Sequence, residues 1–298
     1  MQREKEEPMG FAYHGTAVAF GARLHRPIPD IIPSQASAVL APAGGEGMAV
    51  VRNFDYKGII SFDEARSYVA GSFEKAHPGE PEDSYNTLAT VTIRNLNVGN
   101  MLIADSIVAR VSSRHVVKEG VIADEGEITF DGSLIEGVRI AGLRGQVNLD
   151  SGLLTRYPTF SSFMSDFPRD DQFGEKSRLF WGGENVQNAL QMRRDVAAEG
   201  KGATIPQPCA GVVSCSLFDS FTHGIPTLHE LKKAGKPLNI YRDGFGVTIR
   251  EFGTIYLAEV VMKRGQRRLN MLRFNLGCPL GGDASGGSVE GNGTPTMP

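Results

Sequence analysis

Short runs of alternating apolar and polar residues recur in three parts of the chain, at residues 88–111, 122–149 and 245–276. Glycine, aspartate or asparagine separates the runs, which are rich in β-branched and aliphatic residues. Alternation with a period of two is typical of strands that bury one face, and the separating residues are typical of turns. The pattern therefore predicts a largely antiparallel β domain.

Inside the first of these parts the apolar positions change phase. Val91 and Ile93 share one face of a strand, whereas Leu96 and Val98 fall on the opposite parity. A period of two that slips by one residue indicates a β-bulge, which we place near residues 94–95.

We expect the chain to form one β body with an insertion. Residues 11–150 and 236–278 carry the strand patterns and predict the two parts of that body, an antiparallel β-sandwich or jelly-roll-like fold. Residues 151–235 instead repeat apolar side chains at three- and four-residue spacing, which predicts a helical and loop insertion. The charged residues 1–10 and the glycine-rich residues 279–298 predict solvated tails. The insertion either caps the open end of the sandwich or carries specificity.

Composition and charge narrow the class of protein. The chain has 298 residues and 36 glycines, more than the roughly 21 that average usage gives, and this excess suits turns and bulges. A formal net charge of −3 predicts no generic affinity for nucleic acid or anionic membranes. There is no apolar leader, no run of about 20 apolar residues and no disulfide framework among the 3 cysteines. We therefore expect a soluble, cytoplasmic protein without a transmembrane segment, and export to the cell surface without a classical leader is the alternative.

The motifs of common enzymes are missing from the sequence. There is no G-x-S-x-G nucleophile elbow, no P-loop and no G-x-G-x-x-G that opens a helix. The acidic clusters at residues 124–127 and 170–171 fall in polar loops, where solvated charges explain them. We therefore favour a protein without catalytic activity and without a cofactor.

One constellation could carry metal or thiol chemistry. Cys209, Cys215, His223 and His229 form a C-x5-C-x7-H-x5-H series inside the insertion. Zinc accepts a Cys2His2 ligand set, but five residues between the cysteines are too many for the usual tight knuckle. We therefore favour ordinary core and loop positions for the four residues, with a zinc site or a cysteine–histidine nucleophile pair as alternatives.

Basic residues gather in the turn KRGQRR. Lys263, Arg264, Arg267 and Arg268 lie at the tip of a predicted hairpin. Charge at such a tip costs little and protects against edge-to-edge association. The alternative is a binding surface for a phosphate-rich or carboxylate-rich partner, because arginine forks suit both groups.

Three stretches give the chain a resemblance to a known family. ATVTIRNLNV and NMLIADSIVAR lie at residues 89–110, GSLIEGVRIAG at residues 132–142 and FGTIYLAEV at residues 252–260. Their order resembles that of choice-of-anchor P domains, which are bacterial β-rich domains associated with the cell surface. The resemblance covers half of the chain and implies a β fold and a non-catalytic role, with no site residues. The long insertion and the lack of a leader or C-terminal anchor depart from the family's pattern.

These observations lead to three functional hypotheses. The first is a structural, self-assembling homo-oligomer in which residues 281–298 extend as an arm over a neighbouring subunit. The second is a module that binds a protein or polyanionic partner through the 263–268 hairpin and the insertion. The third is a metal-dependent or thiol hydrolase that uses the cysteines and histidines named above.

Overall fold

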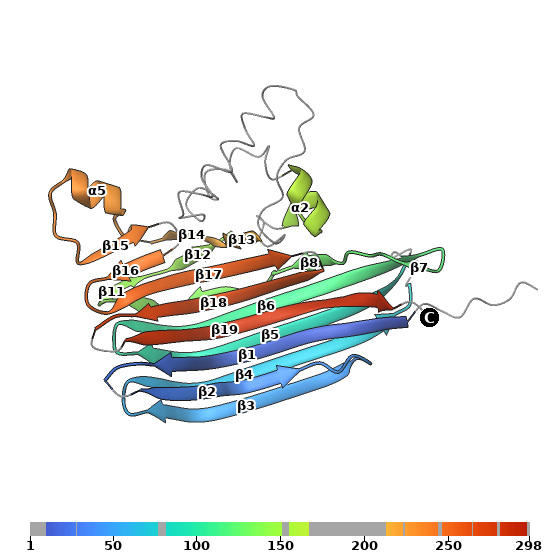
Figure 1. Ribbon diagram of the computed structural model, residues 1–298, viewed down its shortest axis with the longest axis horizontal. Coiled ribbons are helices and arrows are strands. Elements are labelled where there is room, and N and C mark those ends of the chain that lie inside the picture. The colour runs from blue at the N-terminus through green and yellow to red at the C-terminus, as the bar shows by residue number, and fades with distance from the viewer. Residues whose placement is uncertain are drawn as a thin grey trace, which may run out of the picture.

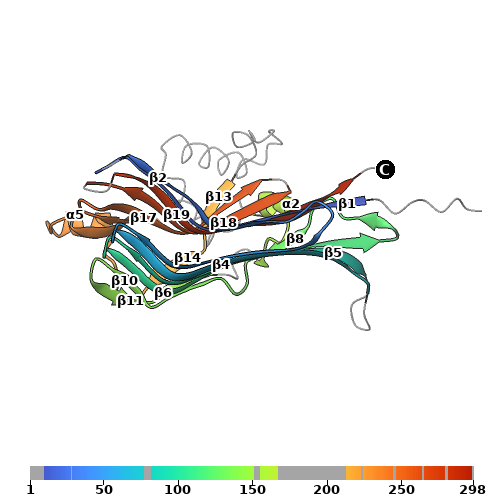
Figure 2. The ribbon, with the colours of Figure 1, turned by 90° about the horizontal axis from the view of Figure 1, so that it is seen from below.

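The structure is a computed structural model that describes residues 10–27, 29–76, 82–150, 155–166, 213–222, 224–243, 246–263, 265–278 and 281–296. Within these residues the chain is mainly β, and two large antiparallel sheets face each other as a sandwich (Figure 1, Figure 2). The antiparallel, sandwich-like fold expected from the sequence is confirmed.

Sheet A forms one layer. Its strands are β1 (Gly10–Leu24), β2 (Asp30–Val39), β13 (Val213–Ser216), β15 (Ile240–Asp243), β16 (Gly246–Ile249), β17 (Gly253–Lys263), β18 (Gln266–Leu276) and β19 (Gly282–Thr296). They lie in the order β15-β16-β17-β18-β19-β1-β2, and β13 pairs with β17 as well. The first and last strands of the chain, β1 and β19, are therefore neighbours within this layer.

Sheet B forms the other layer. Its strands are β3 (Gly45–Tyr56), β4 (Ile60–Glu74), β5 (Asp83–Val98), β6 (Leu102–Lys118), β7 (Val121–Ile122), β8 (Glu127–Thr129), β9 (Leu134–Glu136), β10 (Val138–Ile140) and β11 (Leu143–Gly145). They lie in the order β11-β10-β6-β5-β4-β3, and β7, β8 and β9 also pair with β6. One side of the long strand β6 is thus lined by short strands in succession.

The segment expected to be an insertion, residues 151–235, is partly described. It contains the helices α2 (Phe160–Asp166) and α5 (Leu228–Lys233), and a capping box of Thr227 and Glu230 begins α5. It also contains β13, which joins sheet A, and β14 (Phe218–Phe221), which pairs with β12 (Val147–Leu149). The prediction of helix and loop alone is therefore wrong for its last part, whereas residues 167–212 lie outside the described residues. No described helix is long and apolar enough to cross a membrane.

The core fills the space between the two sheets. Phe20 of β1 and Phe274 of β18 face Ile93 of β5 and Ile107 of β6, and all four side chains are completely buried. Figure 2 shows the two layers one above the other, with their strands curving along their length. Removal of these apolar side chains from water is the main contribution to the stability of such a sandwich.

The phase change expected near residues 94–95 is present, but no residue is inserted. Val91, Ile93, Leu96 and Val98 are all completely buried, so the inward face shifts by one residue. The register of β5 against β6 nevertheless continues unchanged across this point, so the prediction of a β-bulge is wrong. A left-handed backbone at Asn95, with φ of 53°, turns the strand instead.

Asn95 belongs to a row of polar residues that crosses sheet B. The strand registers align Asn53, Asp63, Asn95, Asp105 and Gly137, and φ is positive in every second strand, at 51°, 53° and 62°. Asn95 Nδ2 donates to Asp63 Oδ2 at 2.6 Å across the row. Each long strand of sheet B therefore changes its inward phase at the same level.

Sheet A has a matching row at Ala258, Met271, Gly287, Ala19 and Ala36, again with positive φ in every second strand. At this level of sheet A, two consecutive residues of a strand point inward. The rows of the two sheets lie close together, because a side chain at Gly287 would meet Ile107. The two sheets thus change phase together, which keeps their facing surfaces in contact.

The glycine-rich C-terminal segment is not a tail. Residues 282–296 form β19, which pairs with β18 on one side and β1 on the other. Its glycines allow close packing, because a Cβ at Gly291 would lie 3.2 Å from Val111 Cγ1 and a Cβ at Gly293 would collide with Phe11. The predicted tail at residues 279–298, and the arm built on it, are therefore corrected: glycine here serves tight contact within the sandwich.

Candidate ligand-binding site

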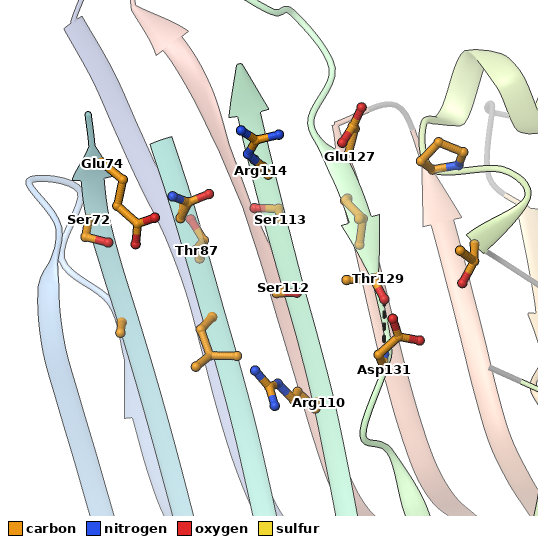
Figure 3. A pocket seen from close by; sticks show the side chains of 16 residues that line it. Ser72, Glu74, Thr87, Arg110, Ser112, Ser113, Arg114, Glu127, Thr129 and Asp131 are labelled. Atoms are coloured by element: carbon orange, nitrogen blue, oxygen red, sulfur yellow. Dashed lines mark hydrogen bonds between the residues drawn. The ribbon is translucent and has the colours of Figure 1, made fainter. Parts of the chain in front are cut away.

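A cavity of about 680 Å³ opens on the outer face of sheet B. It lies over β4, β5, β6 and β8, and Thr155 and Pro158, which precede α2, border it (Figure 3). A volume of this size falls within the range of roughly 300–1,000 Å³ that is common for ligand sites.

Outward-facing side chains of the three long strands form the floor, because every second residue of a strand points to the same face. They are Ala70, Ser72 and Glu74 of β4, Asn86 and Leu88 of β5, and Arg110, Ser112 and Arg114 of β6. The register sets Ala70, Leu88 and Ser112 in one row across the sheet. The short alanine and serine side chains leave a hollow between longer neighbours.

Charged side chains of both signs surround the cavity (Figure 3). Arg110 and Arg114 of β6 stand between Glu74 of β4 on one side and Glu127 and Asp131 on the other. The pairing of β6 with β8 sets Arg114 opposite Glu127. Guanidinium forks bind carboxylates, and carboxylates accept hydrogen bonds from ammonium or guanidinium groups, so the cavity can hold ligand groups of either charge.

The backbone that carries Arg110 is fixed by Ser133. The Ser133 hydroxyl accepts from the Arg110 N–H at 3.0 Å and donates to the Arg110 carbonyl at 3.1 Å. In the same turn, the Asp131 N–H donates to Thr129 Oγ1 at 3.1 Å. The turn after β8 is therefore tied to β6, which fixes the spacing between Arg110 and Asp131.

The basic hairpin does not present its cations as one surface. Lys263 is exposed, whereas Arg264 lies outside the described residues. The Arg267 side chain is only 1% exposed, and it donates to the carbonyls of Ile128 at 3.3 Å and Tyr157 at 2.8 Å. The expected binding surface of Lys263, Arg264, Arg267 and Arg268 is therefore corrected, because the fold uses Arg267 internally.

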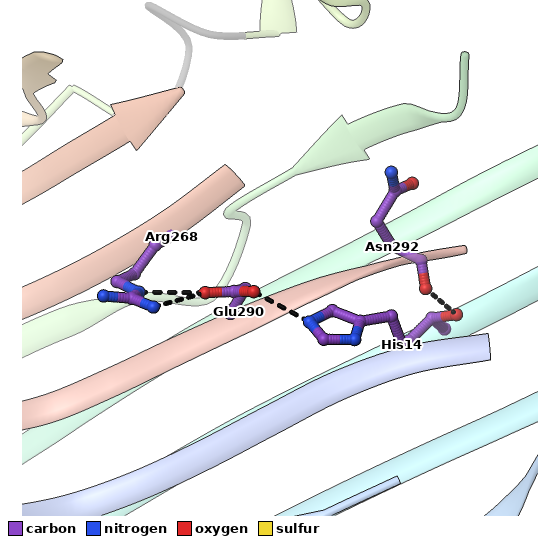
Figure 4. Close-up of polar contacts among 5 residues, drawn as sticks. His14, Arg268, Glu290 and Asn292 are labelled. Atoms are coloured by element: carbon purple, nitrogen blue, oxygen red, sulfur yellow. Dashed lines mark hydrogen bonds and ion pairs between the residues drawn. The ribbon is translucent and has the colours of Figure 1, made fainter. Parts of the chain in front are cut away.

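Arg268 takes part in a charged cluster on the outer face of sheet A (Figure 4). Its Nε and Nη2 lie 2.9 and 2.8 Å from Glu290 Oε2, and His14 Nε2 lies 2.8 Å from Glu290 Oε1. Glu290 is almost completely buried, so both carboxylate oxygens need such partners. The cluster joins β18, β19 and β1, which indicates a stabilising role.

Only two of the four predicted cysteine and histidine ligands, Cys215 and His229, lie within the described residues. Cys215 is in β13 and His229 is in α5, which Figure 1 shows well apart, and Cys209 and His223 lie outside the described residues. Nowhere in the described part of the chain are three or more His, Cys, Asp or Glu side chains placed to hold a metal ion. A zinc or thiol site that uses the undescribed residues stays a prediction.

Comparison with protein families gives one match, to a model described as "Domain of unknown function (DUF8256)", over residues 11–263. This match covers most of the chain. The chain belongs to the DUF8256 family. The part shared with DUF8256 includes every residue that lines the cavity. Searches of curated proteins and of solved structures find no match. The resemblance to choice-of-anchor P domains stays an expectation from the sequence.

The cavity is not among the sites expected from the sequence, although one signal for it is present there. Arg110, Ser112 and Arg114 alternate with Val111 and the buried Ser113, as on a strand with a polar outer face. The acidic residues that border the cavity could not be predicted from such a local pattern. Residues 124–127 were expected to be a solvated loop, and only the pairing of β8 with β6 brings the last of them, a glutamate, to the cavity.

Proposed function

We propose that the protein is a binding module and that the cavity on sheet B holds a short polar segment of a partner protein. The observation that carries this proposal is the central pair Arg110 and Arg114, flanked by carboxylates on both sides. Such alternation matches a peptide of mixed charge, because each ligand group meets an opposite charge.

The same charges argue against a polyanion as the ligand. Glu74, Glu127 and Asp131 would repel closely spaced phosphates, and the hairpin that was expected to attract them buries Arg267. Of the two partners in the second hypothesis, the protein partner is therefore the better supported.

Peptide selection tests this proposal. Peptides are selected from a randomised library on the immobilised protein, and the affinity of an enriched peptide is measured by calorimetry. We expect Arg110→Ala to weaken binding by about tenfold or more, a loss of roughly 1.4 kcal/mol, because a charge-assisted hydrogen bond disappears.

Arg94 provides the matched control. It is also an exposed arginine on the outer face of sheet B, but it lies outside the cavity. Arg94→Ala should leave the affinity unchanged. Equal effects of the two substitutions, or enriched peptides that respond to neither, would count against the cavity as the binding site.

Self-assembly is the second candidate function. The C-terminal arm no longer supports it, but the edge of sheet B does. β3 is a 12-residue edge strand whose only strand partner among the described residues is β4. Measuring the native mass by light scattering tests this candidate: a dimer supports it, and a monomer at every concentration contradicts it.

A further inference from the structure

The edge strand β3 differs from the other sheet edges. β11 and β15 have 3 and 4 residues, and β2 contains Pro33, which cannot donate to a neighbouring strand. β3 has 12 residues and neither proline nor lysine. Exposed edges of this kind are templates for pairing with another strand. Figure 1 shows β3 as the outermost strand of its layer.

The outer face of β3 has a self-complementary order of side chains. Glu46, Met48, Val50 and Arg52 alternate along this face, so that an acid, two apolar groups and a base follow one another. They are arranged symmetrically about Ala49. Met48 is 66% exposed, and Glu46 and Arg52 are exposed as well.

We propose that two copies of this chain pair antiparallel through β3, with Ala49 opposite Ala49 at the two-fold axis. This register sets Glu46 of each copy opposite Arg52 of the other, and Met48 opposite Val50. A two-fold axis repeats each pair, so the dimer gains two ion pairs and two apolar pairs. The proposal deepens the second candidate function, self-assembly, and does not depend on the cavity.

The neighbouring registers lack this complementarity. A dimer centred on Val50 sets Arg52 opposite Met48 and Glu46 opposite Phe54, and one centred on Met48 sets Glu46 opposite Val50. Both leave Glu46 and Arg52 without an opposite charge on the second copy. The Ala49 register also pairs Gly45 with Asn53, so the pairing spans the strand from its first residue to the left-handed turn at Asn53.

Existing contacts of Arg52 are compatible with the pairing. Its Nε donates to Glu64 Oε2 at 2.9 Å within the chain, and its side chain is still 64% exposed. The guanidinium fork can therefore extend its Nη groups to Glu46 of the second copy. The inward-facing Ala49 and Val51 stay packed against the core, so the dimer needs no rearrangement of the sandwich.

Charge exchange tests the register. Light scattering and sedimentation of the full chain should show a dimer at micromolar concentrations. Glu46→Arg and Arg52→Glu should each raise the dimer dissociation constant by about tenfold, because like charges then face each other across the axis. The double variant should return the dissociation constant to within about threefold of the original, because the pairs are restored with reversed polarity.

A cysteine variant provides a measurement that does not depend on these charges. In Ala49→Cys the two thiols would meet at the axis, and paired strands set Cα atoms about 4.5–5.5 Å apart, within the range for a disulfide. With the exposed Cys278 replaced by serine, mild oxidation of Ala49→Cys should then give a covalent dimer that Cys278→Ser alone does not give. Leu88→Cys, on the outer face of β5 away from the edge, is the matched control.

The outcomes separate the proposal from the function on which it rests. A dimer whose dissociation constant does not change with the charge exchanges, and that does not crosslink through residue 49, would support self-assembly but overturn the β3 register. A chain that stays monomeric up to millimolar concentration would overturn both. Loss of the dimer in the single variants without recovery in the double variant would also overturn the register.

Discussion

Arg267 carries a positive charge into the interior of the protein. Its neighbours of the same parity, Leu269 and Met271, are completely buried, so the alternation of β18 directs Arg267 inward. There it binds the carbonyls of Ile128 and Tyr157, which links the β17–β18 hairpin to β8 and to the segment before α2. A cluster of basic residues in a sequence therefore does not always form a charged surface.

Arg267→Ala should be strongly destabilising. The two carbonyls lose their charged donor inside the protein, so we expect the free energy of unfolding to fall by about 3 kcal/mol. Lys263→Ala, on the exposed end of the same hairpin, should change it by less than about 0.5 kcal/mol. Urea denaturation of both variants measures the difference. Similar losses in the two variants would show that Arg267 does not act as a buried link.

Tyr13 should make the stability sensitive to alkaline pH. Burial, with a smaller effect of Tyr85, raises the pKa of the Tyr13 hydroxyl above 10.0, and its ring packs edge-on against Phe11 at 5.0 Å. Because the folded state holds this proton more tightly, its contribution is complete below the unfolded pKa and is lost as pH rises through the folded pKa.

The free energy of unfolding should therefore fall above pH 10.0, and Tyr13→Phe should reduce that fall. Urea denaturation on either side of this pH measures the effect. An identical alkaline loss in the original chain and in Tyr13→Phe would assign the loss to other groups.

In sheet B, the row of left-handed residues determines which residues of each long strand face the core. Asn53 and Asn95 occupy equivalent places in two hairpins, each preceded by arginine, and Gly137 takes the same level between β9 and β10, which both pair with β6. Asparagine and glycine tolerate this backbone better than other residues do. A change of hydrophobic phase in the sequence can therefore mark a left-handed residue as well as a bulge.

Substitution of Asn95 tests this role. Asn95→Val should lower the free energy of unfolding by about 1–2 kcal/mol, because a β-branched residue is strained at positive φ, whereas Asn95→Gly should cost less. Arg94→Val is the matched control, since Arg94 is the exposed neighbour with ordinary strand geometry. Equal losses in Asn95→Val and Arg94→Val would contradict a special backbone at position 95.

Truncation distinguishes the strand β19 from a tail. A chain that ends at residue 281 lacks the strand between β18 and β1, and it should show no cooperative thermal unfolding by circular dichroism. Removal of residues 297–298 alone, beyond β19, should leave the transition unchanged. A normal transition in the longer truncation would mean that β19 is dispensable.

For the whole molecule, the sequence predicted the class of fold but not its connections. Alternation identified strands such as those within residues 88–111 and 245–276, because one face of each sheet is buried. The position of β19 depends on contacts between the two ends of the chain, and glycine composition pointed to a tail. Part of the cavity could be predicted from the sequence, because Arg110, Ser112 and Arg114 alternate along a single strand. Its acidic border depends on the pairing of β8 with β6, which no local pattern shows.

Chemical-shift mapping can locate the binding of a partner-protein segment in the cavity on sheet B. The ¹⁵N-labelled protein is titrated with a selected peptide, and the shifts of the backbone amides are followed. We predict that the largest shifts fall on the strands that line the cavity, at residues 70–74, 86–88, 110–114 and 127–131. Shifts confined to other surfaces at saturation would show that the peptide does not bind in the cavity.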